Sequence, residues 1–343
     1  MPTIKKVAEL AGVSVGTVSH VINESVPVSE PLRLKVRAAI RDLNYQPNHV
    51  ARSLKTSKTR TLGILVPDLT ITFFPQVIRG AEDAARERGY SLIAVNSTDD
   101  GDRQKELLSL LHSQRVEGIL LVVASGPSPL AQISRIMEAG IPVVCLDRIP
   151  DRVPVDSVSV EDTAAAKMGV DHLIAMGHRR IAIVTGPISL KNERRRLDGY
   201  KQALEGAGLE VEDELIWHGN LRPEDVAAVC APRLRDPLSR PGAIFSTNGP
   251  TALGVLRAFR DCGLRTPQDI AFATFDELTC DDLFTPAVTT VVQPARDIGC
   301  CAARILLQRI EEGSSQNASQ PITIRLQAAL KIRESSGPPG VKP

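Results

Sequence analysis

The chain has 343 residues, 43% of them hydrophobic, which allows two or three domains with full cores. No apolar run approaches the roughly 20 residues that span a bilayer and no signal peptide precedes the first element, so we expect a cytoplasmic protein without a membrane partner. Residues 1–60 hold ten Lys or Arg and four acids, whereas the remainder holds 31 and 36, and such a basic head indicates a nucleic-acid-binding module joined to a different body.

The first 23 residues predict a helix-turn-helix. Residues 4–11 place apolar side chains at helical spacing, Gly12 suits the left-handed residue that ends a helix, and Ser14 can cap a second helix. That helix is amphipathic, and its outward face is small apart from one imidazole: Val15, Gly16, Ser19 and His20. Two short helices joined by a Gly-containing turn are typical of a module whose second helix enters the major groove. From the spacing alone, an ordinary helical hairpin remains the alternative.

A third helix over residues 30–43 completes a small three-helix module, which we assign to residues 1–46. Its inner face is an apolar stripe: Leu32, Val36, Ala39, Ile40 and Leu43.

A hinge helix and linker are expected next, over residues 47–60. Leu54, beside Arg52 and Lys55, suits a minor-groove wedge in which an apolar side chain opens a base step while the cations hold phosphates. The helix is too short to be stable alone in water, so it would form only when packed or docked on DNA. A plain linker with a stray leucine is the alternative.

From residue 61 the pattern changes to short apolar runs that alternate with helical stretches. Strands are expected at LGILVP, SLIAVN, VEGILLVV, PVVCLD, RIAIVTG, LIWHG, AIFSTN and IAFATFD, and helices at 74–89, 103–113, 129–140, 193–208, 224–234 and 251–263. This alternation predicts parallel sheets covered on both faces and, with roughly ten strands, two α/β lobes. A helix over 296–312 and a strand near 322–326 can carry the chain back between the lobes, and 336–343 are expected to be a frayed tail.

Head, hinge and body together closely resemble the LacI/GalR family of bacterial transcription regulators. The resemblance is carried by motifs in family order: IKKVAELAGVSVGTVSHVIN, VSEPLRLKVRAAIRDLNYQPNHVARSLKT, TLGILVPDLTITFFPQVIRGAEDAARERGYSLI, RVEGILL, GHRRIAIVTGP, RRRLDGYKQAL, GLRTPQDIAFATFDE and LFTPAVTTVVQP. It implies a nucleoid-associated repressor that binds a pseudo-palindromic duplex operator as a homodimer. It also implies a periplasmic-binding-protein-like body over 61–335, with a sugar or sugar derivative bound between an N-lobe (about 61–160 and 292–322) and a C-lobe (about 161–291 and 323–335).

The resemblance also implies which residues contact DNA and effector. Val15, Gly16 and His20 are expected to read bases while Thr17 and Ser19 hold phosphates. The further DNA contacts expected are Thr3, Ser14, Asn23, Ala51, Arg52, Leu54 and Lys55. The effector contacts expected are Phe73, Phe74, Asp147, Arg148, Arg196, Asn248 and Asp276.

The chemistry of the expected effector residues fits a sugar. Asp147 and Asp276 each end a strand pattern, where α/β sheets place ligand contacts, and a carboxylate can accept two hydrogen bonds from neighbouring hydroxyls. Arg148 and Arg196 can donate to hydroxyls, ring oxygens or an anion. If two guanidiniums of the run 194–196 reached inward, a phosphorylated or acidic sugar would be favoured.

Several positions depart from the family pattern. Lys6 stands where the family usually has an acid, Gly16 lies inside the recognition helix, and Gly249-Pro250 replaces the acid that often follows the matching Asn248. The last change removes one polar contact that an effector could use.

Two other function classes fit the sequence less well. A transport solute-binding protein would fit the body but not the basic head. An α/β enzyme is disfavoured because the sequence has no G-x-G-x-x-G, G-x-x-x-x-G-K-[ST] or G-x-S-x-G motif. The six cysteines show no metal-ligand spacing, so we expect buried free thiols and neither metal, cofactor nor catalytic residues.

Overall fold

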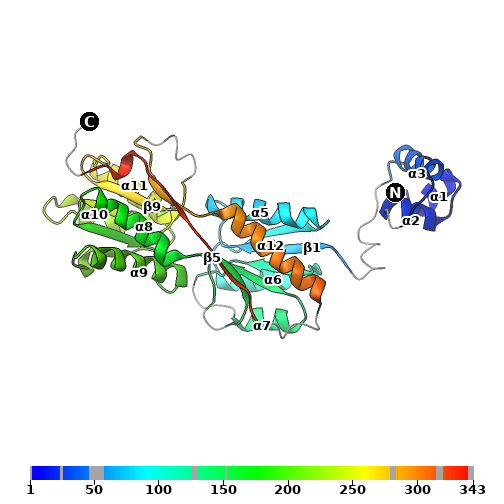
Figure 1. The fold of residues 1–343 in the computed structure, drawn as a ribbon, viewed down its shortest axis with the longest axis horizontal. Coiled ribbons are helices and arrows are strands. Elements are labelled where there is room, and N and C mark those ends of the chain that lie inside the picture. Colours follow the sequence, from blue (N-terminus) through cyan, green and yellow to red (C-terminus); the bar gives the residue numbers. More distant parts are fainter. Residues whose placement is uncertain are drawn as a thin grey trace. The chain divides into compact units, whose positions relative to one another are not determined.

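The computed structural model of the protein describes residues 2–23, 26–45, 58–125, 130–150, 153–278, 283, 285–313 and 320–338. The chain divides into two compact units, Met1–Thr59 and Arg60–Pro343 (Figure 1). The expected hinge helix, with Ala51, Arg52, Leu54 and Lys55, lies outside the described residues.

The described residues of the first unit form three helices: α1 (Ile4–Ala11), α2 (Val15–Asn23) and α3 (Glu30–Asp42). Gly12 ends α1 in the left-handed conformation with φ 65°, and Ser14 Oγ caps α2 by accepting from the Thr17 backbone N–H at 3.1 Å. The predicted helix-turn-helix and third helix are therefore confirmed. One detail was wrong: Leu32 keeps 37% of its surface exposed, because the buried contacts of α3 begin one turn later, at Val36.

The second unit holds two six-stranded sheets, as predicted for a two-lobed α/β body. In the first sheet all neighbouring strands are parallel, in the order β11 (Thr323–Leu326), β5 (Asp156–Val160), β4 (Val143–Leu146), β3 (Gly118–Leu121), β1 (Thr61–Val66), β2 (Ser91–Asn96). The second sheet has the order β12 (Ala329–Lys331), β10 (Thr289–Val292), β9 (Ala271–Phe275), β8 (Ala243–Ser246), β6 (Ile181–Thr185), β7 (Ile216–His218), with β12 antiparallel to β10. We call each sheet with its helices a lobe.

Helices cover both faces of each sheet. The first lobe carries α5 (Phe73–Glu87), α6 (Gly101–Ser113), α7 (Leu130–Glu138) and α12 (Ala295–Glu312). The second carries α8 (Asp162–Ala175), α9 (Lys191–Gly206), α10 (Pro223–Arg235), α11 (Gly249–Cys262) and the short turns η1 (Asp213–Leu215) and η4 (Glu334–Ser336). Strand residues alternate between the two faces: Ile64 packs with α5 and α12, whereas Leu65 packs with α6 and α7.

Two glycines let α5 and α12 cross with their backbones in contact. A Cβ at Gly80 would lie 1.9 Å from the Arg296 carbonyl oxygen, and one at Gly299 would lie 1.9 Å from the Val77 carbonyl oxygen. This close crossing joins the helix of the first crossover, between β1 and β2, to a helix more than 200 residues later in the chain.

The chain passes between the lobes after β5, after β10 and after β11. The last passage corrects the expected boundary at residue 322, because β11 pairs with β5 in the first lobe and the second lobe resumes at β12. The expected list of elements also missed β5, β10, β12 and α8. The β5 sequence DSVSV is polar, yet every residue of the strand is buried; its one charged group, Asp156, accepts from Arg309 with both oxygens, at 2.8 and 2.9 Å.

The start of the expected tail is not frayed. Ser336 Oγ lies 2.7 Å from His172 Nε2 and 2.7 Å from Thr289 Oγ1, and His178 Nε2 donates to the Gly337 carbonyl at 2.9 Å. Ser335 Oγ donates to the carbonyl of a β9 residue, Phe272, at 2.6 Å. These bonds fix residues 335–337 to the second lobe, because buried hydroxyl and imidazole groups need partners.

Candidate functional site

The outward face of α2 matches the expected DNA-reading surface in exposure. Val15 is 40% exposed, and Gly16 and His20 are exposed, whereas Val18 is fully buried against the unit's core. A Cβ at Gly16 would meet only Ser14 Oγ, at 3.5 Å, so among the described residues no other side chain covers the helix at this point. The surface therefore has the small side chains that let a helix approach base edges.

Hydroxyl groups around α2 already take part in hydrogen bonds within the first unit. Ser14 Oγ and Thr17 Oγ1 lie 3.0 Å apart, and Ser14 also caps the helix. Thr3 Oγ1 accepts from the Lys6 backbone N–H at 3.5 Å, the outer limit of a hydrogen bond. Ser19 is half-buried, and the side chain of Asn23 lies outside the described part.

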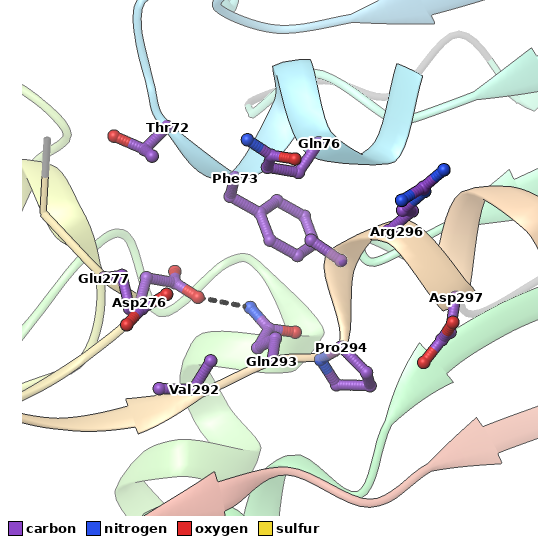
Figure 2. A pocket seen from close by; sticks show the side chains of 11 residues that line it. Thr72, Phe73, Gln76, Asp276, Glu277, Val292, Gln293, Pro294, Arg296 and Asp297 are labelled. Atoms are coloured by element: carbon purple, nitrogen blue, oxygen red, sulfur yellow. Dashed lines mark hydrogen bonds between the residues drawn. The ribbon is translucent and has the colours of Figure 1, made fainter. Parts of the chain in front are cut away.

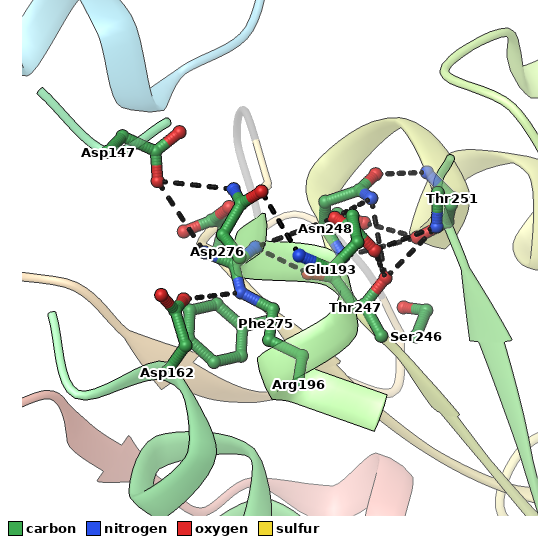
Figure 3. Close-up of polar contacts among 12 residues, drawn as sticks. Asp147, Asp162, Glu193, Arg196, Ser246, Thr247, Asn248, Thr251, Phe275 and Asp276 are labelled. Carbon is green, nitrogen blue, oxygen red and sulfur yellow. Dashed lines mark hydrogen bonds and ion pairs between the residues drawn. The ribbon is translucent and has the colours of Figure 1, made fainter. Parts of the chain in front are cut away.

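In the second unit, residues that follow strands of both lobes converge on one buried cluster (Figure 3). Asp147 follows β4 in the first lobe, and Asn248 and Asp276 follow β8 and β9 in the second. Asp147 and Asp276 both have left-handed backbones, with φ 55° and 72°. Such conformations cost on the order of 1–3 kcal/mol and gather at ligand sites.

Arg196, on α9, is the centre of this cluster and is only 2% exposed. Its Nε donates to Asp162 Oδ1 at 2.8 Å, its Nη1 donates to the Thr247 carbonyl at 2.7 Å, and its guanidinium stacks 3.8 Å from the Phe275 ring centroid. Its Nη2 forms a long ion pair with Asp147 Oδ1 at 3.6 Å, beyond hydrogen-bond distance, and has no hydrogen-bond partner among the described residues. One donor of a buried arginine thus points toward the opposite lobe without an acceptor.

Four buried carboxylates surround this single guanidinium: Asp147, Asp162, Glu193 and Asp276. Burial raises the pKa of Asp162 to about 7 and that of Asp276 to about 6, although Arg196 opposes both shifts. Burial also raises the pKa of Asp147. The cluster carries excess negative charge, so a group that donates hydrogen bonds to it would be stabilised.

Asn248 and Glu193 are hydrogen-bonded to each other next to Arg196. Asn248 Oδ1 accepts from the Thr251 N–H at 2.9 Å in a capping box that starts α11, and its Nδ2 donates to Glu193 Oε1 at 2.9 Å. Glu193 Oε2 accepts from the Gly186 N–H at 2.8 Å and from Thr247 Oγ1 at 2.5 Å. Sequence reasoning missed Glu193, because it stands in a polar run that reads as a solvated helix face.

A cavity of about 270 Å³ lies beside Asp276 (Figure 2). Gln293 lines it, donates from Nε2 to Asp276 Oδ1 at 2.7 Å, and has a buried Oε1 without a partner. Phe73 also lines this cavity, whereas Phe74 does not; Phe74 packs edge-on against Phe73 with 5.2 Å between ring centroids. Gln293 was not among the expected residues, since a lone glutamine after a strand gives no sequence signal.

Arg148 lines a different cavity, of about 360 Å³, which Asn220, Leu221 and Arg222 line from the second lobe. Its Nη1 donates to Asp99 Oδ1 at 2.5 Å, and Asp99 also accepts from the Ser125 N–H and hydroxyl at 2.9 and 2.5 Å. Four of the expected effector residues therefore converge on one cluster (Asp147, Arg196, Asn248 and Asp276), while Arg148 is engaged elsewhere.

Comparison with known proteins places these features in a family. A family model described as "Periplasmic binding proteins and sugar binding domain of LacI family" matches residues 59–331, and one described as "Bacterial regulatory proteins, lacI family" matches residues 3–48. The chain belongs to the LacI family of bacterial regulatory proteins.

Relatives within the LacI family match over nearly the whole chain. The chain is 37% identical to the ribose operon repressor of Escherichia coli (strain K12), covering 94% of this chain and 97% of that protein. It is 37% identical to the HTH-type transcriptional repressor PurR of Vibrio atlanticus (strain LGP32), covering 91% and 93%. The lac repressor dimer, solved bound to operator and the anti-inducer ONPF, matches with a TM-score of 0.82 at 27% identity, covering 98% and 99%.

These relatives are transcription repressors, and the resemblance drawn from the sequence motifs is confirmed. Among the described residues, no helix has the length and apolarity needed to cross a membrane, and no group of His, Cys, Asp and Glu side chains is arranged to hold a metal ion.

Proposed function

We propose that this LacI-family regulator is a dimeric repressor whose α2 reads a pseudo-palindromic operator and whose affinity for that operator is set by a sugar bound between the lobes. The observation that carries the proposal is the cluster around Arg196, in which Asp147 from one lobe meets charged groups of the other within 3.6 Å. A ligand that alters the contact between Asp147 and Arg196 therefore alters the angle between the lobes. The operator-bound dimer of the lac repressor, similar over almost the full chain, supports the assembly.

The coupling follows from linkage. If the sugar binds one lobe arrangement more tightly, it shifts the population toward that arrangement by the ratio of its two affinities. The hinge residues 47–60, with Leu54 as the inserted side chain, then order or melt with the arrangement, and operator affinity follows. Most of the affinity comes from Lys and Arg on phosphates, so binding weakens steeply with salt.

The experiment is a selection of random duplexes with the full-length protein, followed by titration of the selected duplex in the presence and absence of sugars. A palindromic consensus, bound by a dimer and weakened or strengthened by a sugar, is the expected result. Retention of random sequences without enrichment by a monomeric protein would contradict it.

A matched pair of variants tests the reading surface. His20→Ala, on the exposed face of α2, is expected to relax base preference at one position per half-site by about 1–3 kcal/mol while leaving non-specific binding intact. His112→Ala removes an exposed histidine on α6 and serves as the control. Equal behaviour of the two variants on the selected duplex would remove His20 from the reading surface.

A further inference from the structure

Hydrogen bonds hold the chain where it enters the second unit, at Arg60. The Arg60 backbone N–H donates to Glu117 Oε1 at 2.6 Å, and the Arg60 carbonyl accepts from the Ser91 N–H at 2.9 Å. The Glu117 N–H donates in turn to the Thr61 carbonyl at 2.8 Å. Both backbone groups of Arg60 and the carbonyl of Thr61 are therefore bonded to the residues at which β2 begins and β3 is about to begin.

Glu117 has a second donor, which fixes the orientation of its side chain. Its Oε2 accepts from the Tyr90 hydroxyl at 3.0 Å, while Oε1 accepts from Arg60. Burial and the neighbouring charge of Glu117 raise the pKa of Tyr90 to about 12, so the phenol remains a donor at neutral pH. A half-buried carboxylate with a donor on each oxygen is held in one orientation.

The backbone of Arg60 has a conformation that needs support from its surroundings. Its φ is 49°, in the left-handed region that side chains other than glycine adopt rarely and at a cost in energy. Such a conformation persists only where surrounding contacts hold it, and the bond from the Arg60 N–H to Glu117 is one of those contacts. Loss of this bond would make further backbone states available to the residue.

Arg60, Tyr90 and Glu117, which we call the entry clamp, lie at the edge of the first sheet that is opposite the cleft. They directly precede β1, β2 and β3, which are neighbouring parallel strands. Asp147, in contrast, follows β4 at the carboxyl edge of the same sheet. Since hydrogen-bonded strands move together as one body, a rotation of the first lobe at the cleft also moves the entry clamp.

Given the proposed function, on which this inference rests, we propose that Glu117 is a positioning residue for repression, because it fixes the direction in which the preceding linker joins the body. Specific binding requires that the two heads of a dimer meet two half-sites at a set spacing. If the linker turns freely at Arg60, operator binding must order that residue in each subunit, and the affinity falls. Non-specific binding requires no set spacing and is independent of the clamp.

The test compares full-length Glu117→Ala with wild type on the operator selected by the wild-type protein and on a random duplex. Operator affinity is expected to fall at least about 10-fold, because one more residue per subunit must be ordered, while affinity for the random duplex stays within about twofold. Hydrogen exchange at the Arg60 amide, followed by mass spectrometry, should accelerate at least about 10-fold.

Each other outcome has a distinct meaning. An unchanged operator affinity, an equal loss on both duplexes or an unchanged rate of exchange overturns the role of Glu117 and leaves the operator-binding repressor in place. A wild-type protein that selects no operator overturns the proposed function, and the role of Glu117 with it.

Two further variants separate the bond from the charge. Glu117→Gln keeps an oxygen that can accept from the Arg60 N–H, so operator affinity should return to within about twofold of wild type. Glu311→Ala removes an exposed carboxylate of the same lobe, which pairs with Arg88 at 2.7 Å, and serves as the control. A loss in Glu311→Ala as large as that in Glu117→Ala would assign the effect to charge and overturn the inference.

Tyr90→Phe decides if Glu117→Ala does not fold. It removes only the hydroxyl that orients Glu117, and the ring keeps its packing against the core of the first lobe. Operator affinity is expected to fall about threefold, with no change on the random duplex and with faster exchange at the Arg60 amide. An operator affinity equal to that of wild type would overturn the inference.

Discussion

The two lobes share one architecture but contribute unequally to the site between them. The second lobe supplies a connected network, in which Asn248 donates to Glu193 and Glu193 pairs with Arg196. The first lobe supplies Asp147 to that network, and its buried arginine, Arg148, is engaged with Asp99 instead. The second lobe thus carries a preformed half-site, which the first lobe approaches through one carboxylate, that of Asp147.

This asymmetry has a local origin. Glu193 and Arg196 are three residues apart on α9 and therefore share a face, which the crossover from β6 directs at the start of α11. Changes in the second lobe should consequently affect folding and ligand together, whereas changes at Asp147 should affect ligand alone.

The largest expected effect is that of Arg196→Met. It removes the one cation among four buried carboxylates, so the free energy of unfolding should fall by about 3–5 kcal/mol and the midpoint of thermal unfolding by roughly 10 °C. Arg148→Met is the counterpart in the first lobe. It should cost less, because Asp99 keeps both bonds from Ser125. Equal losses in the two variants would erase the contrast between the lobes.

Asn248→Ala should come next, at about 2 kcal/mol, because it removes the cap of α11 together with the donor to buried Glu193. The matched change in the first lobe is Asp100→Ala. Asp100 caps α6 by accepting from the Arg103 N–H at 2.7 Å, and it supports no buried group, so about 1 kcal/mol is expected. Chemical denaturation measures both, and a larger loss for Asp100→Ala would contradict the asymmetry.

The pH dependence of stability should also reveal the cluster. Asp162 has a folded-state pKa of about 7, well above its ordinary value, so the folded protein binds the extra proton and the free energy of unfolding decreases as pH rises toward 7 and just beyond. The contribution is at most about 1.4 kcal/mol per pH unit.

Two histidines of the second lobe act in the opposite sense. Burial lowers the pKa values of His172 and His178, so these groups destabilise the folded protein as pH falls. The measurement is therefore the difference between wild type and Asp162→Asn in unfolding midpoint from pH 5 to 8. We expect Asp162→Asn to become more stable relative to wild type as pH rises. A difference in unfolding midpoint that does not change with pH would show that Asp162 does not titrate in this range.

The smallest effect on stability is expected for Asp147→Asn. Asparagine tolerates the φ of 55° at this position, so the free energy of unfolding should change by less than about 0.5 kcal/mol, while affinity for the sugar should fall about tenfold. Asp147→Ala distinguishes loss of the charge from strain in the backbone. Alanine is strained at positive φ, so the free energy of unfolding should fall by about 1 kcal/mol more than in Asp147→Asn. A large loss of stability in Asp147→Asn would give the first lobe a structural role in the cluster that its two long contacts, with Arg196 at 3.6 Å and Asn192 at 3.5 Å, do not indicate.

Much of the architecture could be predicted because its signals are local. Gly12 and Ser14 mark a helix end and a helix start through their own backbone and side-chain preferences, and continuous apolar runs mark buried parallel strands. The same reasoning placed Asp147 and Asp276 at strand ends, where the structure has them. It failed for β5, whose Asp156 is neutralised by an arginine 153 residues away.

The sequence by itself therefore determined the family, the order of helices and strands, and which polar residues end the strands that face the cleft. Only the tertiary structure decided that Arg196 alone turns inward, that Arg148 is occupied by Asp99, that Gln293 and Glu193 join the site, and that Ser335 and Ser336 are bound rather than frayed. The reason is physical. Caps and periodicity depend on neighbours within a few residues, whereas the state of a buried polar group depends on partners that folding brings from distant parts of the chain.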